Sequence, residues 1–251
     1  MKKTSFVERD KPLLCAMVQE NTKTEAICMI CNAISEGAEA IGIQLECLER
    51  QYLTEEDFKE IFSYCKGLPI YATAYRKDDL TDEKCAQILM SAARCGATLC
   101  DVMGDMFHPE PHELTFDETA IGKQKELIAA LHAAGCEVLM SSHLHAFFPE
   151  QEVVRFARAQ EERGADIVKI VNVSETEETA LENICTCMNL KHLISKPYLY
   201  LANGKFCNLL RQIGGKLGCC MYLCVERYTK NSSKEQPLLR SMRMIRDLMV
   251  G

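Results

Sequence analysis

Two patterns of hydrophobic and polar positions alternate along the whole chain: short apolar runs of strand length, and longer stretches with helical periodicity. We expect the apolar runs to form eight strands, at residues 13–18, 40–45, 70–74, 99–103, 137–141, 164–173, 198–201 and 221–224. Strand-then-helix units with short connections, repeated in this way, favour a closed parallel barrel over an open doubly wound sheet. The predicted fold is therefore a (β/α)8 TIM barrel of the α/β class.

The helical stretches carry end signals that support this order. After the first strand, apolar residues recur at Ala26 and Ile30 and stop at Gly37, which is typical of a helix C-terminus. Thr54, with Asp57 three residues later, resembles a capping box at the start of the next helix. No linker or low-complexity tract interrupts the pattern, and one such barrel typically has about 250 residues. We therefore expect one domain over residues 1–251.

Composition and charge exclude several classes of partner. The chain is 47% hydrophobic and 26% charged, which is ordinary for a soluble globular protein. Its formal net charge of -7 leaves no basic face for nucleic acid or anionic lipid. No segment approaches the roughly 18 uncharged apolar residues of a membrane span, and the N-terminus lacks an apolar signal-peptide core. We predict a cytoplasmic protein with no nucleic-acid or membrane partner.

The 15 cysteines are best interpreted as reduced thiols, because most stand where buried apolar residues belong and no secretory signal precedes them. Cys28 and Cys31 form a C-x-x-C pair in a helical stretch, but no second pair follows at zinc-binding spacing. We therefore expect core packing and no structural metal.

Lys169 is the most informative residue, because it stands in the middle of the apolar run 164–173. A buried ammonium is so costly that it either finds a carboxylate or gives up its proton. A neutral lysine can attack a carbonyl and form a Schiff base. His143 lies at the carboxyl-terminal end of the preceding predicted strand, and histidine is well suited to moving protons near neutral pH. The alternative is a structural ion pair of Lys169 with Asp101 or Glu46.

Other residues carry weaker signals. Arg211 follows the seventh strand, where a guanidinium can clamp a carboxylate, with decoration of the helix surface as the alternative. His145 stands two residues after His143, but no third ligand for a metal stands at a neighbouring strand end. The G-x-S-x-G and G-x-G-x-x-G patterns are absent, so neither a serine nucleophile nor a dinucleotide is indicated. We predict no cofactor and no metal.

From residue 12 to residue 238 the chain resembles the type I 3-dehydroquinate dehydratases, the Schiff-base enzymes of the shikimate pathway of aromatic amino acid biosynthesis. Five segments carry the resemblance. Residues 164–170 match the family's lysine motif, and Ser141-Ser142-His143 with Pro149 fits the segment that carries its catalytic histidine. Ala74-Tyr75-Arg76 resembles its T-x-R strand end, Arg211 with Gly218 its S-R…G-S segment, and residues 232–236 its S-A-P-G-Q loop.

The resemblance implies a role for each matching residue. Lys169 would form an imine with the substrate ketone, and His143 would shuttle the proton as water is eliminated. Four further residues would hold the carboxylate and hydroxyls, namely Arg76, Arg211, Ser232 and Gln236. The resemblance also implies a homodimer without metal or cofactor that acts on a small-molecule keto acid, converting 3-dehydroquinate to 3-dehydroshikimate or a close analogue.

Departures from the family pattern fall on the groups that read the substrate. Gly42 and Gln44 replace the glutamate and arginine of an E-x-R-x-D strand end, and Met103 replaces the glutamate of D-x-E. The acid that orients the catalytic histidine falls on Leu80, or on Asp79 with a one-residue shift. Because loss of buried hydrogen-bond partners changes selectivity, the pattern indicates a divergent relative with a changed substrate.

Two other functions remain open at this stage. The lysine imine also fits a retro-aldol lyase acting on a different keto acid. The missing histidine-orienting acid fits a non-catalytic barrel that binds a metabolite or a partner protein. The leading hypothesis is the dehydrating lyase.

Overall fold

The computed structural model describes residues 5–8 and 10–249, so residues 1–4, 9 and 250–251 of the predicted domain lie outside the description. The prediction that the N-terminal stretch lacks a signal peptide concerns residues 1–4 and 9 among others, so it lies partly outside the described residues.

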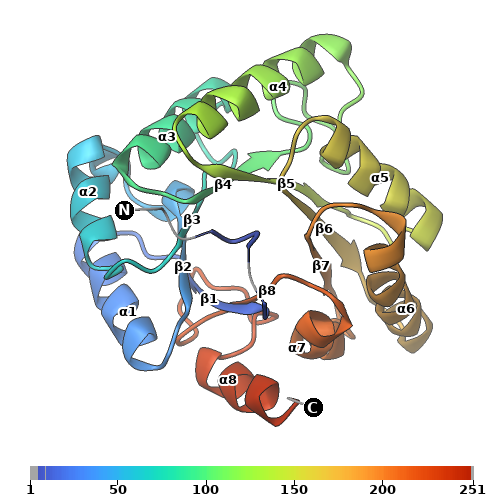
Figure 1. Cartoon of the computed structure of the whole chain (residues 1–251). Coiled ribbons are helices and arrows are strands. Elements are labelled where there is room, and N and C mark those ends of the chain that lie inside the picture. The colour runs from blue at the N-terminus through green and yellow to red at the C-terminus, as the bar shows by residue number, and fades with distance from the viewer. Residues whose placement is uncertain (1–4, 9, 250–251) are drawn as a thin grey trace.

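Eight parallel strands form one sheet in the order β7-β6-β5-β4-β3-β2-β1-β8. The sheet nearly closes on itself, because the Cys220 N–H, just before β8, donates to the Tyr198 carbonyl at the start of β7 (2.9 Å). Figure 1 looks along the axis of this ring, with the helices outside it. The predicted (β/α)8 barrel is confirmed.

The strands fall close to the predicted runs, and two of them extend further towards their carboxyl ends. Their bounds are β1 (Leu13–Val18), β2 (Ala40–Gln44), β3 (Ile70–Thr73), β4 (Leu99–Met103), β5 (Glu137–His143), β6 (Ile167–Val173), β7 (Tyr198–Asn203) and β8 (Met221–Cys224).

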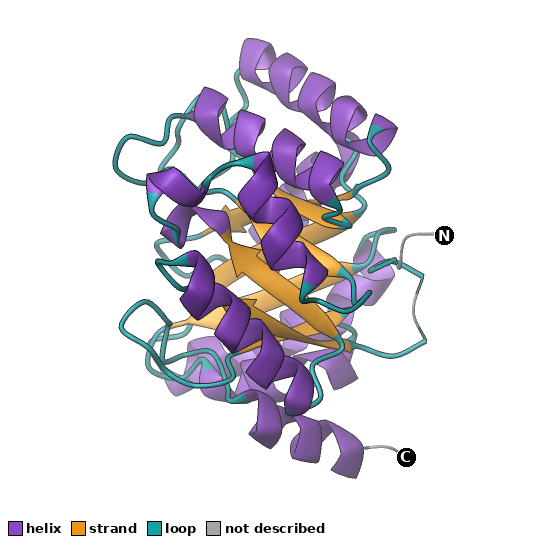
Figure 2. Cartoon of the chain, turned by 90° about the vertical axis from the view of Figure 1, so that its left-hand side faces the viewer, coloured by secondary structure: helices purple, strands orange, loops and turns teal. Residues whose placement is uncertain are grey.

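A helix follows each strand: α1 (Lys23–Ser35), α2 (Glu55–Ser63), α3 (Asp82–Cys95), α4 (Glu118–Ala133), α5 (Glu150–Glu162), α6 (Glu177–Leu193), α7 (Asn208–Leu217) and α8 (Leu239–Leu248). Short 3-10 turns at Leu45–Cys47 and Arg50–Tyr52 separate β2 from α2. Figure 2 shows the strands enclosed by the helices, with loops at both ends of the barrel. Among the described residues, no helix combines the length and apolar character needed to cross a membrane.

The predicted helix ends are observed. The Thr54 hydroxyl accepts from the Asp57 N–H and caps α2, and Gly37 follows α1 in a left-handed conformation (φ 95°). Such caps satisfy backbone groups that a helix end leaves unpaired. These two helix ends therefore lie where their local sequence predicts.

The amino-terminal end of the barrel is plugged. Phe6 is 1% exposed, and its N–H donates to Glu137 at the start of β5. The Phe6 ring also packs edge-on against inward-facing Tyr71 on β3, with 6.4 Å between ring centroids. Ligand access is thereby left to the carboxyl-terminal end of the strands.

Candidate active site

A cavity of about 170 Å³ opens at the carboxyl-terminal ends of the strands, where a barrel of this kind holds its ligand. Its wall is formed by Met17, Gln19, Gln44, Tyr71, Thr73, Tyr75, His143, Lys169, Val171, Leu201, Asn203, Arg211, Leu223, Ser233, Glu235 and Gln236. Four of the six predicted site residues line this cavity together: Lys169, His143, Arg211 and Gln236. Arg76 and Ser232 lie outside it.

Lys169 points into the barrel from the middle of β6 and is only 4% exposed. Its backbone is fixed by Gln160 on α5, whose side-chain amide accepts from the Lys169 N–H and donates to its carbonyl, both at 3.1 Å. The Lys169 Nζ donates to the Tyr75 hydroxyl at 2.7 Å, to Asp101 at 3.1 Å and to the Tyr71 hydroxyl at 3.3 Å. The amine is thus held in one place by three oxygen atoms.

Asp101 on β4 is the acidic partner of this lysine. Its carboxylate accepts from the Tyr75 hydroxyl at 2.6 Å, from Ser141 at 2.5 Å, and from Tyr71. Burial alone raises the pKa of Asp101, but the Lys169 charge and the three hydroxyls outweigh it and hold the pKa below its usual value. Asp101 therefore stays ionised beside the ammonium.

The alternative interpretation of Lys169, an ion pair with Asp101, is thus present in the structure. Glu46 is not the partner, because its carboxylate accepts from Thr73 instead (2.9 Å). Burial raises the pKa of Glu46 to about 7. An ion pair does not by itself exclude imine chemistry, because a protonated imine carries the same charge as the ammonium and can keep the same carboxylate partner.

His143 ends β5 and is held by Glu113, a residue of the loop between β4 and α4. One Glu113 oxygen lies 2.6 Å from the His143 Nδ1 and accepts from the His143 backbone N–H at 3.0 Å. Burial raises the pKa of Glu113, but its hydrogen bond to His143 and the histidine charge lower it below the usual value. Because Nδ1 is bound to a carboxylate, Nε2 is the ring nitrogen available for proton transfer.

The acid that orients this histidine is therefore neither Leu80 nor Asp79. Leu80 is a buried apolar residue at 5% exposure. The Asp79 carboxylate lies at the surface, 2.8 Å from Arg50 and 3.0 Å from Lys84. Sequence reasoning missed Glu113, because it lies in an irregular loop with no fixed spacing to His143, and only the fold brings the two together.

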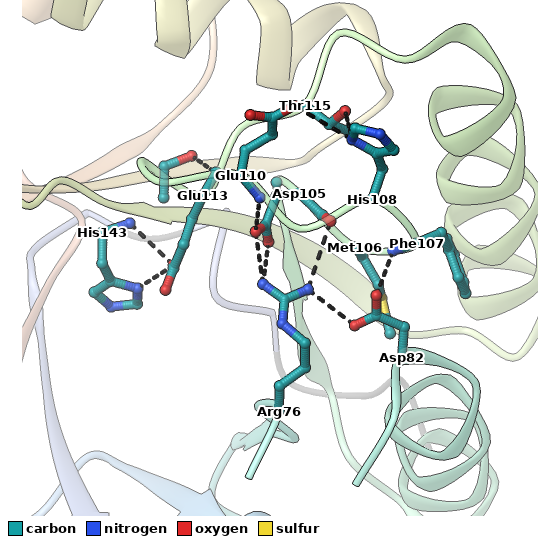
Figure 3. A network of polar contacts seen from close by, with 12 residues as sticks. Arg76, Asp82, Asp105, Met106, Phe107, His108, Glu110, Glu113, Thr115 and His143 are labelled. Carbon is teal, nitrogen blue, oxygen red and sulfur yellow. Dashed lines mark hydrogen bonds and ion pairs between the residues drawn. The ribbon is translucent and has the colours of Figure 1, made fainter.

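Arg76 does not line the cavity. Figure 3 shows its guanidinium directed at Asp82 and Asp105, beside the Glu113–His143 pair. The guanidinium donates to both Asp105 oxygens at 2.6 Å and to Asp82 at 2.9 Å. Burial lowers the pKa of Arg76, but these two carboxylates raise it above the usual value. Its position indicates a structural ion pair.

Arg76 misses the cavity because the alternation of inward- and outward-facing side chains differs from the predicted one by a single residue. Strand β3 ends at Thr73, and Thr73 and Tyr75 both face the cavity because alternate residues point the same way. The T-x-R pattern thus fits Thr73-Ala74-Tyr75 better than Ala74-Tyr75-Arg76. Tyr75 occupies the place where that pattern has its arginine, and it packs edge-on against His143 with 5.6 Å between ring centroids.

Of the remaining predicted contacts, Arg211 and Gln236 line the cavity and Ser232 does not. Arg211 on α7 donates from Nε to the Ala202 carbonyl (2.7 Å) and from a terminal nitrogen to Asn203 (2.5 Å). Gln236 accepts from Gln19 at 3.2 Å. Ser232 closes a turn with Thr229, accepting from its N–H (2.7 Å) and donating to its carbonyl (3.1 Å). Its neighbour Ser233 lines the cavity instead.

The positions that depart from the family pattern are accommodated by packing. A Cβ added at Gly42 would lie 2.2 Å from the sulfur of Met17, so the side chain of Met17 fills the space that a larger residue needs. Gln44 lines the cavity as a neutral amide, and Met103 is buried in the apolar core.

A metal site is not indicated by the described residues. They contain no group of three or more His, Cys, Asp or Glu side chains arranged to hold an ion. His145 is exposed, and its backbone N–H lies 3.4 Å from the His112 ring nitrogen.

Comparison with known sequences gives a consistent result. A family model described as type I 3-dehydroquinase matches residues 14–250. The curated 3-dehydroquinate dehydratase of Klebsiella pneumoniae is 28% identical over 169 residues, covering 64% of this chain and 62% of that protein. That of Neisseria gonorrhoeae is 28% identical over 107 residues, covering 42% and 41%. The chain thus aligns with about three fifths of the first relative's length and about two fifths of the second's.

Solved structures are similar over nearly the whole chain. The 3-dehydroquinate dehydratase of Geobacillus kaustophilus has a TM-score of 0.83 at 14% identity, covering 97% of this chain and 93% of that one. The type I enzyme of Clostridium difficile has a TM-score of 0.83 at 16% identity, covering 97% and 94%. At these identities the likeness establishes the fold.

Proposed function

This chain belongs to the type I 3-dehydroquinase family, and from that premise we propose that it is a hydro-lyase that forms a lysine imine. Its substrate is 3-dehydroquinate or a close cyclic analogue, from which it eliminates water. The observation that carries the proposal is that Lys169 and His143 line one cavity, each with its own carboxylate partner. The relatives named above are 3-dehydroquinate dehydratases, which supports the same reaction.

Imine formation begins at Lys169. Its amine must release a proton before it can attack the substrate ketone. Asp101 lies within hydrogen-bond distance to receive it, either directly or through the Tyr75 hydroxyl, which takes the amine proton as it passes its own to Asp101. Attack gives a carbinolamine; the proton held by Asp101 is returned to its hydroxyl, which leaves as water and gives a protonated imine. The imine nitrogen is again cationic, so Asp101 pairs with it as it paired with the ammonium. The buried carboxylate thus favours the intermediate that the reaction needs.

Elimination then requires a base and an acid at the neighbouring carbons, and His143 serves as both. Its Nε2 removes a proton from the carbon beside the imine, which yields an enamine. The imidazolium returns that proton to the departing hydroxyl, so that water leaves and a carbon–carbon double bond forms. Glu113 holds the ring and stabilises the imidazolium between these two steps. Hydrolysis of the imine finally releases Lys169 and the enone product.

The non-catalytic alternative was based on the missing acid that orients the histidine, and Glu113 lies against His143 as such an acid. We therefore favour the enzyme over a non-catalytic barrel. Arg211 and Gln236 remain the proposed substrate contacts, and Arg76 and Ser232 are left out because they lie away from the cavity. We extend the proposal, on the family resemblance, to a cytoplasmic homodimer that acts on a small-molecule keto acid without a cofactor.

A dehydration assay tests the proposal. The absorbance of a conjugated enone should rise when the protein is mixed with 3-dehydroquinate or its cyclic β-hydroxy ketone analogues, and Lys169→Ala should abolish the rise. Lys191→Ala, a change on the surface of α6, serves as the control and should leave the rate unchanged. Release of an aldehyde in place of the enone would favour the retro-aldol reaction. No enone from any of these ketones would refute the proposal.

A further inference from the structure

The cavity has a charge balance that bears on the kind of substrate it accepts. The two groups of the proposed catalytic pair each face a carboxylate of their own, Asp101 for Lys169 and Glu113 for His143. Arg211 is the third residue of the cavity wall that can carry a positive charge. Its charge therefore decides whether an anionic substrate finds a partner.

Arg211 is already engaged by the protein. Its Nε and one terminal nitrogen donate to Ala202 and Asn203, and Glu235 lies 3.7 Å from the same terminal nitrogen. The Arg211 side chain is 7% exposed and that of Glu235 is 34% exposed, so the guanidinium is largely desolvated while the carboxylate stays partly accessible to solvent. A substrate carboxylate would have to compete with Glu235 for the guanidinium and would be repelled by it.

Glu235 is anchored in this position. One of its oxygens accepts from the Gly204 N–H at 2.9 Å, and the other accepts from Ser233 at 3.2 Å. In the S-A-P-G-Q loop that residues 232–236 resemble, glycine stands where this chain has Glu235. The negative charge is thus an addition to the wall and is fixed by three separate contacts.

A neutral group of the same cavity wall requires a hydrogen-bond donor. Gln19 is 6% exposed, and its Nε2 donates to Gln236. Its Oε1 is buried without a partner among the described residues. An amide oxygen can only accept hydrogen bonds, so the Gln19 Oε1 is matched by a hydroxyl or amide N–H group of a ligand, and a carboxylate cannot supply that donor.

We propose that this site selects an uncharged, polyhydroxylated cyclic ketone, and that Glu235 is the residue that excludes a carboxylate. This inference rests on the proposed function but departs from the keto acid that the family resemblance implies: the substrate is an analogue of 3-dehydroquinate that carries a hydroxymethyl or carboxamide group in place of the acid. Glu235 acts on specificity through the cavity charge and takes no part in the proton transfers.

Isothermal titration calorimetry with quinate and its carboxamide tests this selection. Neither compound has the ring ketone, so neither forms an imine, and binding is measured apart from chemistry. The wild-type protein should bind the carboxamide at least tenfold more tightly than quinate. Glu235→Gln keeps an oxygen for the Gly204 N–H but removes the charge, and should erase this preference by tightening quinate binding about tenfold. Glu182→Gln, an exposed change of the same charge on α6, should leave the ratio unchanged.

The outcomes separate this inference from the proposed function. Tighter wild-type binding of quinate, no binding of the carboxamide, or an unchanged ratio in the folded Glu235→Gln variant would overturn the role of Glu235. Dehydration of 3-dehydroquinate by a protein that prefers quinate would overturn the selection and leave the proposed function standing. Selective binding of the carboxamide without dehydration of any ketone would overturn the proposed function and leave the selection by Glu235 standing.

Discussion

A substitution at Glu113 changes the charge beside the proposed proton carrier His143 without changing a residue that lines the cavity. Glu113→Gln preserves the shape of the side chain and one acceptor for His143, but removes the negative charge beside the ring. We expect kcat to fall because the imidazolium that forms during elimination loses its partner. KM should stay within about twofold of the wild type, because Glu113 is not among the residues that line the cavity.

The size of the effect follows from the geometry. Opposite unit charges about 4 Å apart attract by about 4 kcal/mol at an effective dielectric constant of about 20. The two side chains are 26% and 22% exposed, and solvent screening reduces this to about 2–3 kcal/mol. Since about 1.4 kcal/mol corresponds to a factor of ten in rate, kcat should fall by about 30- to 150-fold.

The assay is the steady-state rate of enone formation, with circular dichroism to verify that the variant is folded. Glu110→Gln is a matched control, because Glu110 lies in the same loop and pairs with His108 (3.2 Å) outside the cavity. The control should keep the wild-type kcat. A folded Glu113→Gln protein with kcat within threefold of the wild type would refute the assignment of His143 as the proton carrier.

Three further changes separate structural from catalytic roles. Arg76→Ala leaves the buried Asp105 without its cation, so the free energy of unfolding in urea should fall by about 2–4 kcal/mol. KM should stay unchanged, and a tenfold rise in KM would restore Arg76 as a substrate contact. Tyr75→Phe removes the hydroxyl 2.7 Å from the Lys169 Nζ and should slow borohydride-trapped imine formation about tenfold, whereas an unchanged rate would exclude Tyr75 from proton transfer. Burial raises the pKa of Glu46 to about 7, so ionising it opposes folding: wild-type stability should fall by up to about 3 kcal/mol as pH rises from about 4.5 to about 7. Glu46→Gln should flatten this dependence in urea unfolding at pH 5 and pH 8, and an unchanged slope would contradict it.

The barrel and the proposed catalytic pair were predictable because both depend on local patterns. Strand-length apolar runs specify where each unit begins, and the closed parallel order makes Lys169 and His143 neighbours on β6 and β5. A lysine inside an apolar run is conspicuous, since burial of an ammonium requires an explanation. The distance along the sequence between the two residues did not matter, because the fold class supplied their proximity.

The other parts of the site depend on phase and on loops, which periodicity does not determine. The predicted strand includes Ala74, one residue beyond the end of β3 in the structure. The side chain that faces the cavity is therefore Tyr75, where the sequence pattern had indicated Arg76. Glu113 and Glu235 lie in irregular loops and reach their partners only through tertiary structure. Their roles follow from distances between atoms, and no spacing in the sequence encodes those distances.

The central claim, that the Lys169 amine attacks a ketone in this cavity, is tested most directly by borohydride reduction followed by peptide mass spectrometry. The protein is incubated with 3-dehydroquinate or its carboxamide, reduced and digested. We expect the peptide that contains Lys169 to gain the mass of a reduced ketone adduct with at least one of the two compounds. An unmodified Lys169 with both compounds, in protein that remains folded, would contradict the account.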